Sequence, residues 1–316
     1  MGQRKEVVLE TPITHQTVYL TRACQFAGIS RSCIYFKKKV QIVSPPGRKP
    51  PGYTMNRDGT LILDHTIVSI LKEYRREVVF LNAGGAKKLS KYIAIEKKIY
   101  INHKKIYRLC DENKLLLFKQ DFTKKRKFKK NRCEYLEVSK PNELWQLDLK
   151  YIWIHGESRW CFLLAFIDVV SKKITGWYLG KTCKASDLVF TLDQALRNEC
   201  ITDEQTLVIR SDNGPQMSSN RFYFYLKNLE KKLIHEFIPP KSPVRNAYIE
   251  AFNSILEIEV LQVRYFKDFE SVYEAVMKFV EFYNCRRLHG ALGYLSPKMF
   301  IEGLKNGSIT PRVVAV

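Results

Sequence analysis

The chain has 316 residues and 45% apolar content, so it has room for two or three globular domains. Its 53 Lys and Arg against 32 Asp and Glu give a net charge of +21. A surplus this large makes nucleic acid the default partner, with an anionic membrane surface as the competing one. No apolar run is long enough to span a bilayer, and the first residues lack a signal-peptide apolar region, which argues against membrane and secreted proteins.

The cysteines predict neither disulfides nor a zinc site. All eight are scattered, no pair has C-x-x-C spacing, and none is coupled to histidine at zinc-ligand spacing. Reduced, mostly buried thiols in a cytoplasmic protein are the simplest interpretation.

Residues 1–40 show the pattern of a helix-turn-helix. Apolar residues repeat at helical spacing over 20–27, Gly28 makes a break, and Ser30 can cap a second helix. That second helix is basic, and its candidate DNA contacts are Arg31, Lys37 and Lys38. An ordinary helical hairpin is the alternative.

Residues 41–60 carry four prolines and three glycines, which predicts a linker. Residues 61–118 then predict a second helical DNA-binding unit, in which Asn102 caps a helix. Its apolar side holds Ile106, Leu109 and Cys110, and its candidate DNA contacts are Lys104, Lys105 and Arg108. Residues 119–142 follow as a basic linker, where Lys124, Lys125 and Arg126 can neutralise phosphates.

From residue 143 the pattern changes to that of an α/β domain. Aromatic and β-branched runs predict three close-set strands at 144–154, 159–170 and 173–180, then a helix at 184–198. A strand at 206–212, a helix at 219–231, a strand at 233–239 and two helices at 245–264 and 270–285 complete the order. A meander followed by helical crossovers predicts a mixed five-stranded sheet flanked by helices.

Two aspartates stand where such a sheet forms its sites. Asp212 ends a buried strand, and Asp148 lies within the first strand with its side chain on the face opposite to its neighbours. If these strands are neighbours, both carboxylates meet at one point, and a helix can add Glu250, Glu257 or Glu259. The alternative for Asp212 is a residue that only caps the turn N-G-P after it.

Four segments in this order carry a resemblance to a known family. They are "LWQLDLKYI", "SDNGPQ", "NAYIEAFNSILEIE" and "YNCRRLHGALGYLSPKMF". The chain resembles the DDE transposases and integrases with an RNase H-like core, and in particular the bacterial insertion-sequence group whose transposase is made from two overlapping reading frames. The resemblance implies an RNase H-like catalytic core over 143–302, a C-terminal tail over 303–316, and a catalytic triad of Asp148, Asp212 and Glu250.

That triad implies phosphoryl transfer with two Mg²⁺ ions, for which Mn²⁺ can substitute. Two ions roughly 3.5–4 Å apart clamp a phosphodiester, one at the attacking and one at the leaving oxygen. The expected function is a transposase that nicks element ends and joins them to target DNA. Two rivals stay open: a catalytically silent or domesticated DNA-binding protein, and an RNase H-like nuclease that only hydrolyses.

Further positions follow from the resemblance. Asn213 and Gln216 are candidate substrate contacts, Asn246 caps or positions the catalytic helix, and Arg287 and His289 either contact DNA phosphate or form structural hydrogen bonds. Asp168 is expected in a turn. Glu257 stands where many members carry Lys or Arg, which makes it a rival to Glu250 on the same helix face.

The family also implies partners and a place of action. These are the element's terminal repeats and target DNA, further copies of the chain, and an element-encoded first-frame partner with a helix-turn-helix. A bacterial cytoplasmic protein, associated with the nucleoid when bound to DNA, is expected.

Overall fold

The computed structural model describes residues 28, 52–77, 85–116, 136–239, 243–310 and 313–316. The predicted DNA contacts Arg31, Lys37, Lys38, Lys124, Lys125 and Arg126 lie outside these residues. Gly28 has a φ of 62°, the left-handed conformation that suits the predicted break. The chain divides into two compact units, Met1–Pro51 and Gly52–Val316, and the second unit holds nearly all described residues.

The second unit begins with a small helical region. Strands β1 (Tyr53–Met55) and β2 (Leu61–Leu63) form a hairpin, followed by α4 (Asp64–Glu77), α5 (Ala86–Glu96) and α6 (His103–Glu112). Ile67, Ile93 and Ile106 belong to one buried cluster between the helices. The Asn102 side chain accepts from the backbone N–H of Lys104 at 2.9 Å, which confirms the predicted cap.

Strand β1 lies inside the segment predicted as a linker over 41–60. A two-stranded hairpin needs hydrogen bonds on one side only, so nearby prolines do not prevent it. The linker prediction was therefore wrong for Tyr53–Met55.

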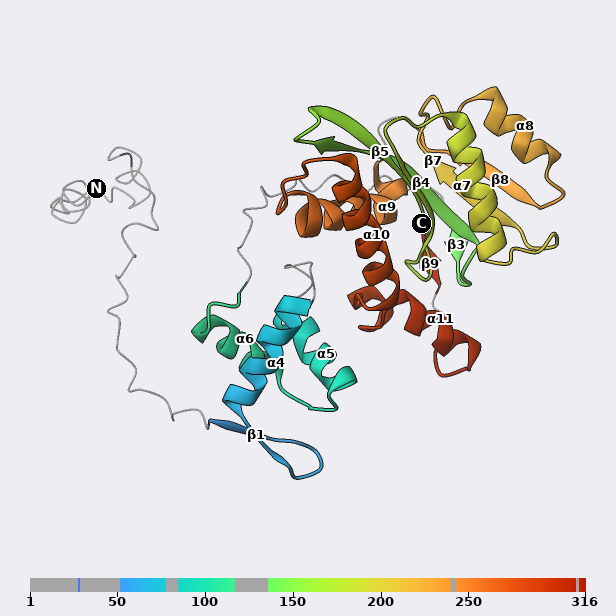
Figure 1. The fold of residues 1–316 in the computed structure, drawn as a ribbon. Helices are drawn as coiled ribbons and strands as arrows, with labels where there is room; N and C mark the ends of the chain where they lie inside the picture. The colour runs from blue at the N-terminus through green and yellow to red at the C-terminus, as the bar shows by residue number, and fades with distance from the viewer. Residues whose placement is uncertain (1–27, 29–51, 78–84, 117–135, 240–242, 311–312) are drawn as a thin grey trace, which may run out of the picture. The chain divides into compact units, whose positions relative to one another are not determined.

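A five-stranded mixed sheet forms the centre of the α/β region, as predicted (Figure 1). Its strands are β4 (Leu144–Ile154), β5 (Arg159–Asp168), β6 (Ile174–Gly180), β7 (Leu207–Ser211) and β8 (Leu233–Phe237), in the order β6-β5-β4-β7-β8. The β4–β7 and β7–β8 pairs are parallel, whereas the β4–β5 and β5–β6 pairs are antiparallel. Strands β4 and β7 are thus neighbours.

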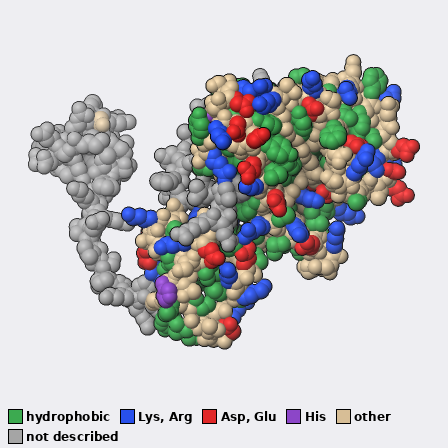
Figure 2. All heavy atoms as spheres, in the orientation of Figure 1, with side chains coloured by type: hydrophobic (Ala, Val, Ile, Leu, Met, Phe, Trp, Pro, Cys, Tyr) green, Lys and Arg blue, Asp and Glu red, His purple; other side chains and the backbone are tan. Residues whose placement is uncertain are grey.

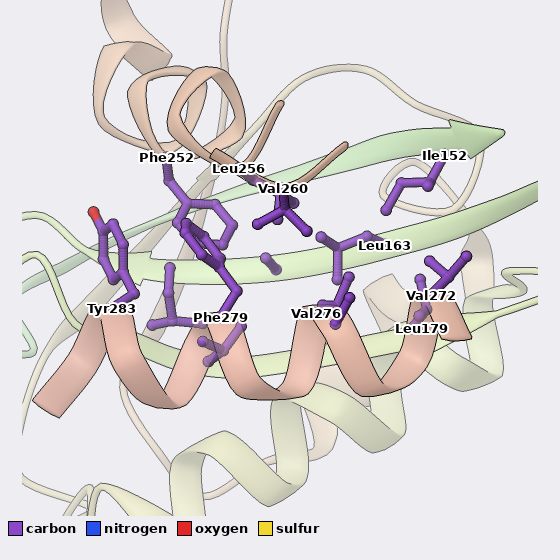
Figure 3. Close-up of a cluster of buried hydrophobic side chains, with 14 of the residues drawn as sticks. Ile152, Leu163, Leu179, Phe252, Leu256, Val260, Val272, Val276, Phe279 and Tyr283 are labelled. Carbon is purple, nitrogen blue, oxygen red and sulfur yellow. The ribbon is translucent and has the colours of Figure 1, made fainter. Parts of the chain in front are cut away.

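The helices cover the sheet on both faces. Side chains of α7 (Ala185–Asn198) and α8 (Asn220–Asn228) share a buried cluster with Trp145 and Leu147 of β4. Helices α9 (Ala247–Leu256) and α10 (Phe269–Cys285) share a second cluster with Ile152, which points to the opposite face. Figure 3 shows this cluster, in which Val276 and Phe279 of α10 point toward the strands.

Short elements connect and close the domain. The 3₁₀ turn η1 (Pro243–Asn246) precedes α9, the π-helical turn η2 (Glu257–Leu261) continues it, and η3 (Gly290–Leu292) follows α10. Helix α11 (Pro297–Lys305) begins at a Ser296 cap. Strand β9 (Val314–Ala315) pairs with β3 (Glu137–Val138), so the end of the segment predicted as a tail packs on the end of the segment predicted as a basic linker.

Two smaller expectations are tested by the described residues. No helix within the described ranges is long and apolar enough to cross a membrane. The five described cysteines are all free, and Cys110 and Cys161 are buried, but Cys200 and Cys285 are exposed. The expectation of mostly buried thiols was therefore too broad.

Candidate active site

Asp148 lies within β4, two residues past the part of that strand that pairs with β7, and Asp212 directly follows the last residue of β7. The register pairs Gln146 of β4 with Arg210 of β7, and two further residues along each strand reach the two aspartates. Neighbouring strands lie about 4.8 Å apart. The prediction that these carboxylates meet at one point of the sheet is therefore consistent with the strand order.

The environment of Asp148 disfavours its charged form. Burial raises the pKa of its carboxyl above the usual 3.8, and the negative charge of Asp212 raises it further. A hydrogen bond from Asn253 Nδ2 to Asp148 Oδ2, at 2.7 Å, opposes these effects in part. A half-buried acid whose pKa is raised by burial and by a second acid nearby is a common feature of functional sites.

Asp212 also shapes the turn that it begins. Its Oδ1 accepts from the backbone N–H of Gly214 at 3.1 Å, which is the turn-capping role expected of an Asx residue. A Cβ on Gly214 would lie 3.1 Å from this same oxygen, so the close approach suits glycine. Capping uses one carboxylate oxygen, and the Asp212 side chain remains exposed.

Helix α9 is seated on β4 by a buried glutamine that sequence reasoning missed. Gln146 is fully buried, and its Oε1 accepts from the backbone N–H groups of Tyr248 and Ile249 at 3.0 and 3.1 Å. Its Nε2 donates to the Arg245 carbonyl at 2.8 Å. Gln146 thus satisfies the first turn of α9 in place of a residue of the helix itself. A polar residue in the apolar run "LWQLDL" was the available signal.

One face of α9 runs along β4 and carries Glu250. Asn246 Nδ2 donates to the Leu147 carbonyl at 3.1 Å, and Asn253 contacts Asp148. Glu250 stands between them, four residues after Asn246 and three before Asn253, which places all three on one helix face. Its side chain is exposed. Asn246 makes no side-chain cap bond, so it positions the helix without capping it.

The two rival glutamates are engaged elsewhere. Glu257 forms an ion pair with Lys150 of β4 at 2.7 Å. Glu259 is buried and pairs with Arg287 at 2.6 Å. Glu250 lies within α9, on the same helix face as Asn253, which contacts Asp148, and this position makes it the acid best placed to join the aspartates.

Arg287 and His289 are both buried, which favours the structural alternative over phosphate contact. The pKa of His289 falls to about 3, first because of burial and then because of Arg287, so its ring is neutral.

Asp168 is also fully buried and accepts from the backbone N–H groups of Asn142 and Ser171, as expected of a turn residue.

The remaining candidates divide by their contacts. Asn213 is exposed, and Gln216 donates to the Cys183 carbonyl at 3.1 Å, which ties the turn to the α7 start. Lys105 and Arg108 both pair with Asp64, at 2.6 and 3.1 Å, so these pairs hold α6 to α4. Lys104 is exposed.

The donor set suits a hard divalent cation. All three acids offer carboxylate oxygens, the ligands that Mg²⁺ prefers, and a cation between Asp148 and Asp212 would relieve their repulsion. Within the described residues, no three His, Cys, Asp or Glu side chains already lie close enough together to form a metal cage. The three carboxylates must therefore come closer together if they are to share a cation.

Replacing Gln146 by leucine is expected to lower both activity and stability. Two N–H groups of α9 would lose their acceptor, which costs about 1–3 kcal/mol of unfolding free energy. The shifted helix would misplace Glu250, and we expect about 10–100-fold slower DNA cutting, as for other residues that orient metal ligands. Urea unfolding and single-turnover cutting measure the two effects. Full activity in Gln146→Leu would show that the seat of α9 does not position the site.

Comparison with known proteins finds an integrase core in the α/β region of this chain. The family described as "Integrase core domain" matches residues 138–243, and a second family of the same description matches residues 231–297. An uncharacterized 39.2 kDa protein of insertion element IS476 from Xanthomonas euvesicatoria is 26% identical over 94% of this chain and 77% of its own length. The transposase of insertion sequence element IS904 from Lactococcus lactis is 27% identical over 53% of this chain and 64% of its own length.

Solved structures are more distant. A simian T-cell lymphotropic virus intasome chain aligns with a TM-score of 0.42 and 16% identity, over 71% of this chain and 70% of that chain. The two integrase core matches together cover 138–297, the region that holds the sheet, both aspartates and α9. The chain therefore belongs to the DDE transposases and integrases, enzymes that share this integrase core domain.

Proposed function

We propose that this chain is a DNA transposase that cuts the ends of an insertion element and joins them to target DNA. Asp148, Asp212 and Glu250 are its metal-binding catalytic residues in this proposal. The observation that supports it most is the position of Asp148 and Asp212, each two residues past the last paired residues of the neighbouring parallel strands β4 and β7, with Glu250 on the helix face that contacts Asp148. Bound divalent ions would activate the attacking oxygen and stabilise the leaving oxygen of a phosphodiester.

The residues of the chain have separate tasks in this proposal. Asp148 and Asp212 hold the charge that attracts the cations, and Asn253 keeps the Asp148 carboxylate oriented through its hydrogen bond. Gln146 holds α9 in register with β4, so that Glu250 approaches from one direction. Asn213 and Gln216 flank the pair and contact the DNA backbone.

The proposal includes partners. Two element ends must be brought together for joining, so at least two copies of the chain act as one assembly. A first-frame partner with a helix-turn-helix assists end recognition, and the complex associates with the nucleoid when bound to DNA.

Metal binding tests the proposed site without any cutting assay. Mn²⁺ is titrated into the full chain, and its binding is measured by calorimetry or electron paramagnetic resonance. We expect it to bind wild type and Glu257→Gln. Binding should be lost or strongly weakened in Asp148→Asn and Asp212→Asn. Equal binding by all four proteins would place the cations elsewhere and contradict the assignment.

The raised pKa of Asp148 also predicts the pH dependence of stability. Below pH 3.8 this carboxyl is protonated in both states, and stability is lost as the pH rises through the higher folded-state pKa. At pH 7, in a chelator that removes metal ions, the Asp148 carboxyl is ionised and its burial lowers the stability of the wild type. Asp148→Asn should therefore melt at the same temperature as wild type or higher. The difference between the two melting temperatures should narrow toward pH 4.

Adding Mg²⁺ at pH 7 should reverse that order. A ligand at about 100 times its Kd stabilises by about 2.7 kcal/mol, and only wild type can bind it. If Asp148→Asn melts far below wild type in the chelator, the Asp148 side chain stabilises the folded state without metal, which would contradict this prediction.

A further inference from the structure

Surface charge does not mark a further binding site on the face of the molecule that Figure 2 draws. Lys and Arg side chains lie on both the helical region and the sheet region there, interspersed with acidic ones. Polar groups inside the fold are more informative, because a buried donor or acceptor needs a partner.

Two neighbouring strands place a hydrogen-bonded serine and histidine beside the turn that Asp212 begins. Ser211 is the last residue of β7, directly before Asp212, and it is fully buried. Its Oγ lies 2.9 Å from Nε2 of His235, a half-buried residue of β8. Neither residue is one of the candidate metal ligands.

The direction of the hydrogen bonds in this pair follows from the atoms involved. Ser211 Oγ also lies 2.8 Å from the Asp212 carbonyl oxygen, which can only accept. A hydroxyl has one hydrogen, so Ser211 donates it to this carbonyl and accepts from His235. His235 therefore carries a hydrogen on Nε2. Burial lowers the pKa of its imidazole below the usual 6.5, so the ring is neutral at pH 7 and donates through Nε2–H.

The Ser211 hydroxyl fixes the peptide group that follows Asp212. The Ile238 N–H donates to the Ser211 carbonyl at 2.9 Å, and the Gly214 N–H donates to Asp212 Oδ1 at 3.1 Å. Between these two bonds, the orientation of the planar Asp212 peptide group sets the direction in which the chain turns toward Gly214. By holding this carbonyl, the hydroxyl also keeps the Gly214 N–H in place against the Asp212 carboxylate.

The imidazole of His235 is itself held by two aromatic rings. The Phe222 ring of α8 meets it in a T-shaped contact, with ring centroids 5.1 Å apart, and the Phe237 ring centroid lies 4.2 Å away. Phe222 is fully buried. Packing against both rings restricts rotation of the imidazole and keeps Nε2 directed at Ser211.

We infer that the His235–Ser211 pair positions the Asp212 carboxylate for cation binding. His235 donates to Ser211, and Ser211 donates to the Asp212 carbonyl, so both are positioning residues that act through the backbone of Asp212. The inference rests on the proposed function, because it takes Asp212 as a metal ligand. The alternative is a histidine that only packs in the core, which predicts lower stability without a specific loss of metal affinity.

Two substitutions of His235 separate hydrogen-bond donation from packing. Glutamine can place an amide N–H close to the position of imidazole Nε2, whereas methionine has a similar length but no donor. We expect Mn²⁺ to bind His235→Met about 10–100-fold more weakly than wild type, as for other residues that orient metal ligands. His235→Gln should stay within about threefold of wild type. Calorimetry or electron paramagnetic resonance on the full chain gives the dissociation constants.

Ser211→Ala removes the other half of the pair. It should weaken Mn²⁺ binding by a similar factor, and the double variant Ser211→Ala with His235→Met should bind no more weakly than the weaker single variant, because both residues act through one carbonyl. His155→Met is the matched control, since His155 is exposed and contacts Tyr265 just beyond the end of β4. This control should bind Mn²⁺ as wild type does.

Cutting and melting measurements distinguish positioning from a general loss of the fold. At saturating DNA, His235→Met should cut more slowly at low Mn²⁺ and recover in part at high Mn²⁺, with unchanged DNA affinity. His235→Met and His235→Gln should melt at similar temperatures in a chelator, so that a difference in their Mn²⁺ affinity does not come from stability.

Two results would overturn the inference. One is wild-type Mn²⁺ affinity in both His235→Met and Ser211→Ala while Asp212→Asn has lost binding, which leaves the proposed function intact. The other is an equal loss of affinity in His235→Gln and His235→Met together with equally lowered melting temperatures, which would be a packing effect. If Asp212→Asn binds Mn²⁺ as tightly as wild type, the proposed function fails as well.

Discussion

Asp148→Asn, Asp212→Asn and Glu250→Gln are each expected to slow DNA cutting by more than about 1,000-fold. A metal-ion site contributes several kcal/mol to transition-state stabilisation, and each 1.36 kcal/mol is a factor of ten in rate. All three changes keep the size of the side chain and remove only its charge. DNA affinity should change little, so single-turnover cutting at saturating protein isolates the chemical step.

Glu257→Gln is the matched control for Glu250→Gln. Both residues lie on the face of the α9–η2 segment that follows β4, but Glu257 pairs with Lys150. This pair is partly exposed and worth about 1 kcal/mol or less, so its loss should leave cutting within about threefold of wild type. If DNA cutting is lost in Glu257→Gln and kept in Glu250→Gln, the catalytic acid is Glu257 and not Glu250.

Arg287→Met is expected to lower the free energy of unfolding by about 3–5 kcal/mol. The Arg287 and Glu259 side chains are only 7% and 4% exposed, and their nitrogen and oxygen lie 2.6 Å apart. Removing one partner leaves the other as an uncompensated buried charge. Urea denaturation measures the loss, and the double variant Arg287→Met with Glu259→Gln should recover much of it.

Arg197→Met is a suitable control for this change. Arg197 pairs with Asp193 on the surface of α7 and is 72% exposed, so its loss should cost no more than about 0.5 kcal/mol. If Arg287→Met lowered the free energy of unfolding as little as the control does, and weakened DNA binding instead, Arg287 would be a phosphate contact and not a structural residue.

The strands and helices of the α/β region could be predicted because each depends on the spacing of apolar residues within its own segment. The strand at 144–154 agrees with β4 at both ends, and the helix at 184–198 differs from α7 by one residue. Period-two and helical repeats specify such elements, and the chain order limits how they can pair. The pairing of β4 with β7, which brings Asp148 and Asp212 toward each other, was only a condition of the prediction, and the observed register supplies it.

Contacts between distant residues could not be read in the same way. Nothing near Arg287 in the chain indicates its partner Glu259, and nothing near Gln146 indicates that it seats the first turn of α9. Strands of two residues, such as β3 and β9, carry no periodicity at all. Helix α11 was not predicted, although its Ser296 cap and Pro297 form a local start signal for a helix.

The measurement that tests the central claim most directly maps the products formed on the DNA that flanks the gene. The full chain and Mg²⁺ are incubated with that DNA, and nicks and joined strands are located by sequencing. We expect nicks at the ends of the element and strands joined at new positions, both lost in Asp212→Asn. Cutting that survives Asp212→Asn, or nicks without any joined strand, would contradict the assignment of this chain as a DDE transposase with Asp212 in its active site.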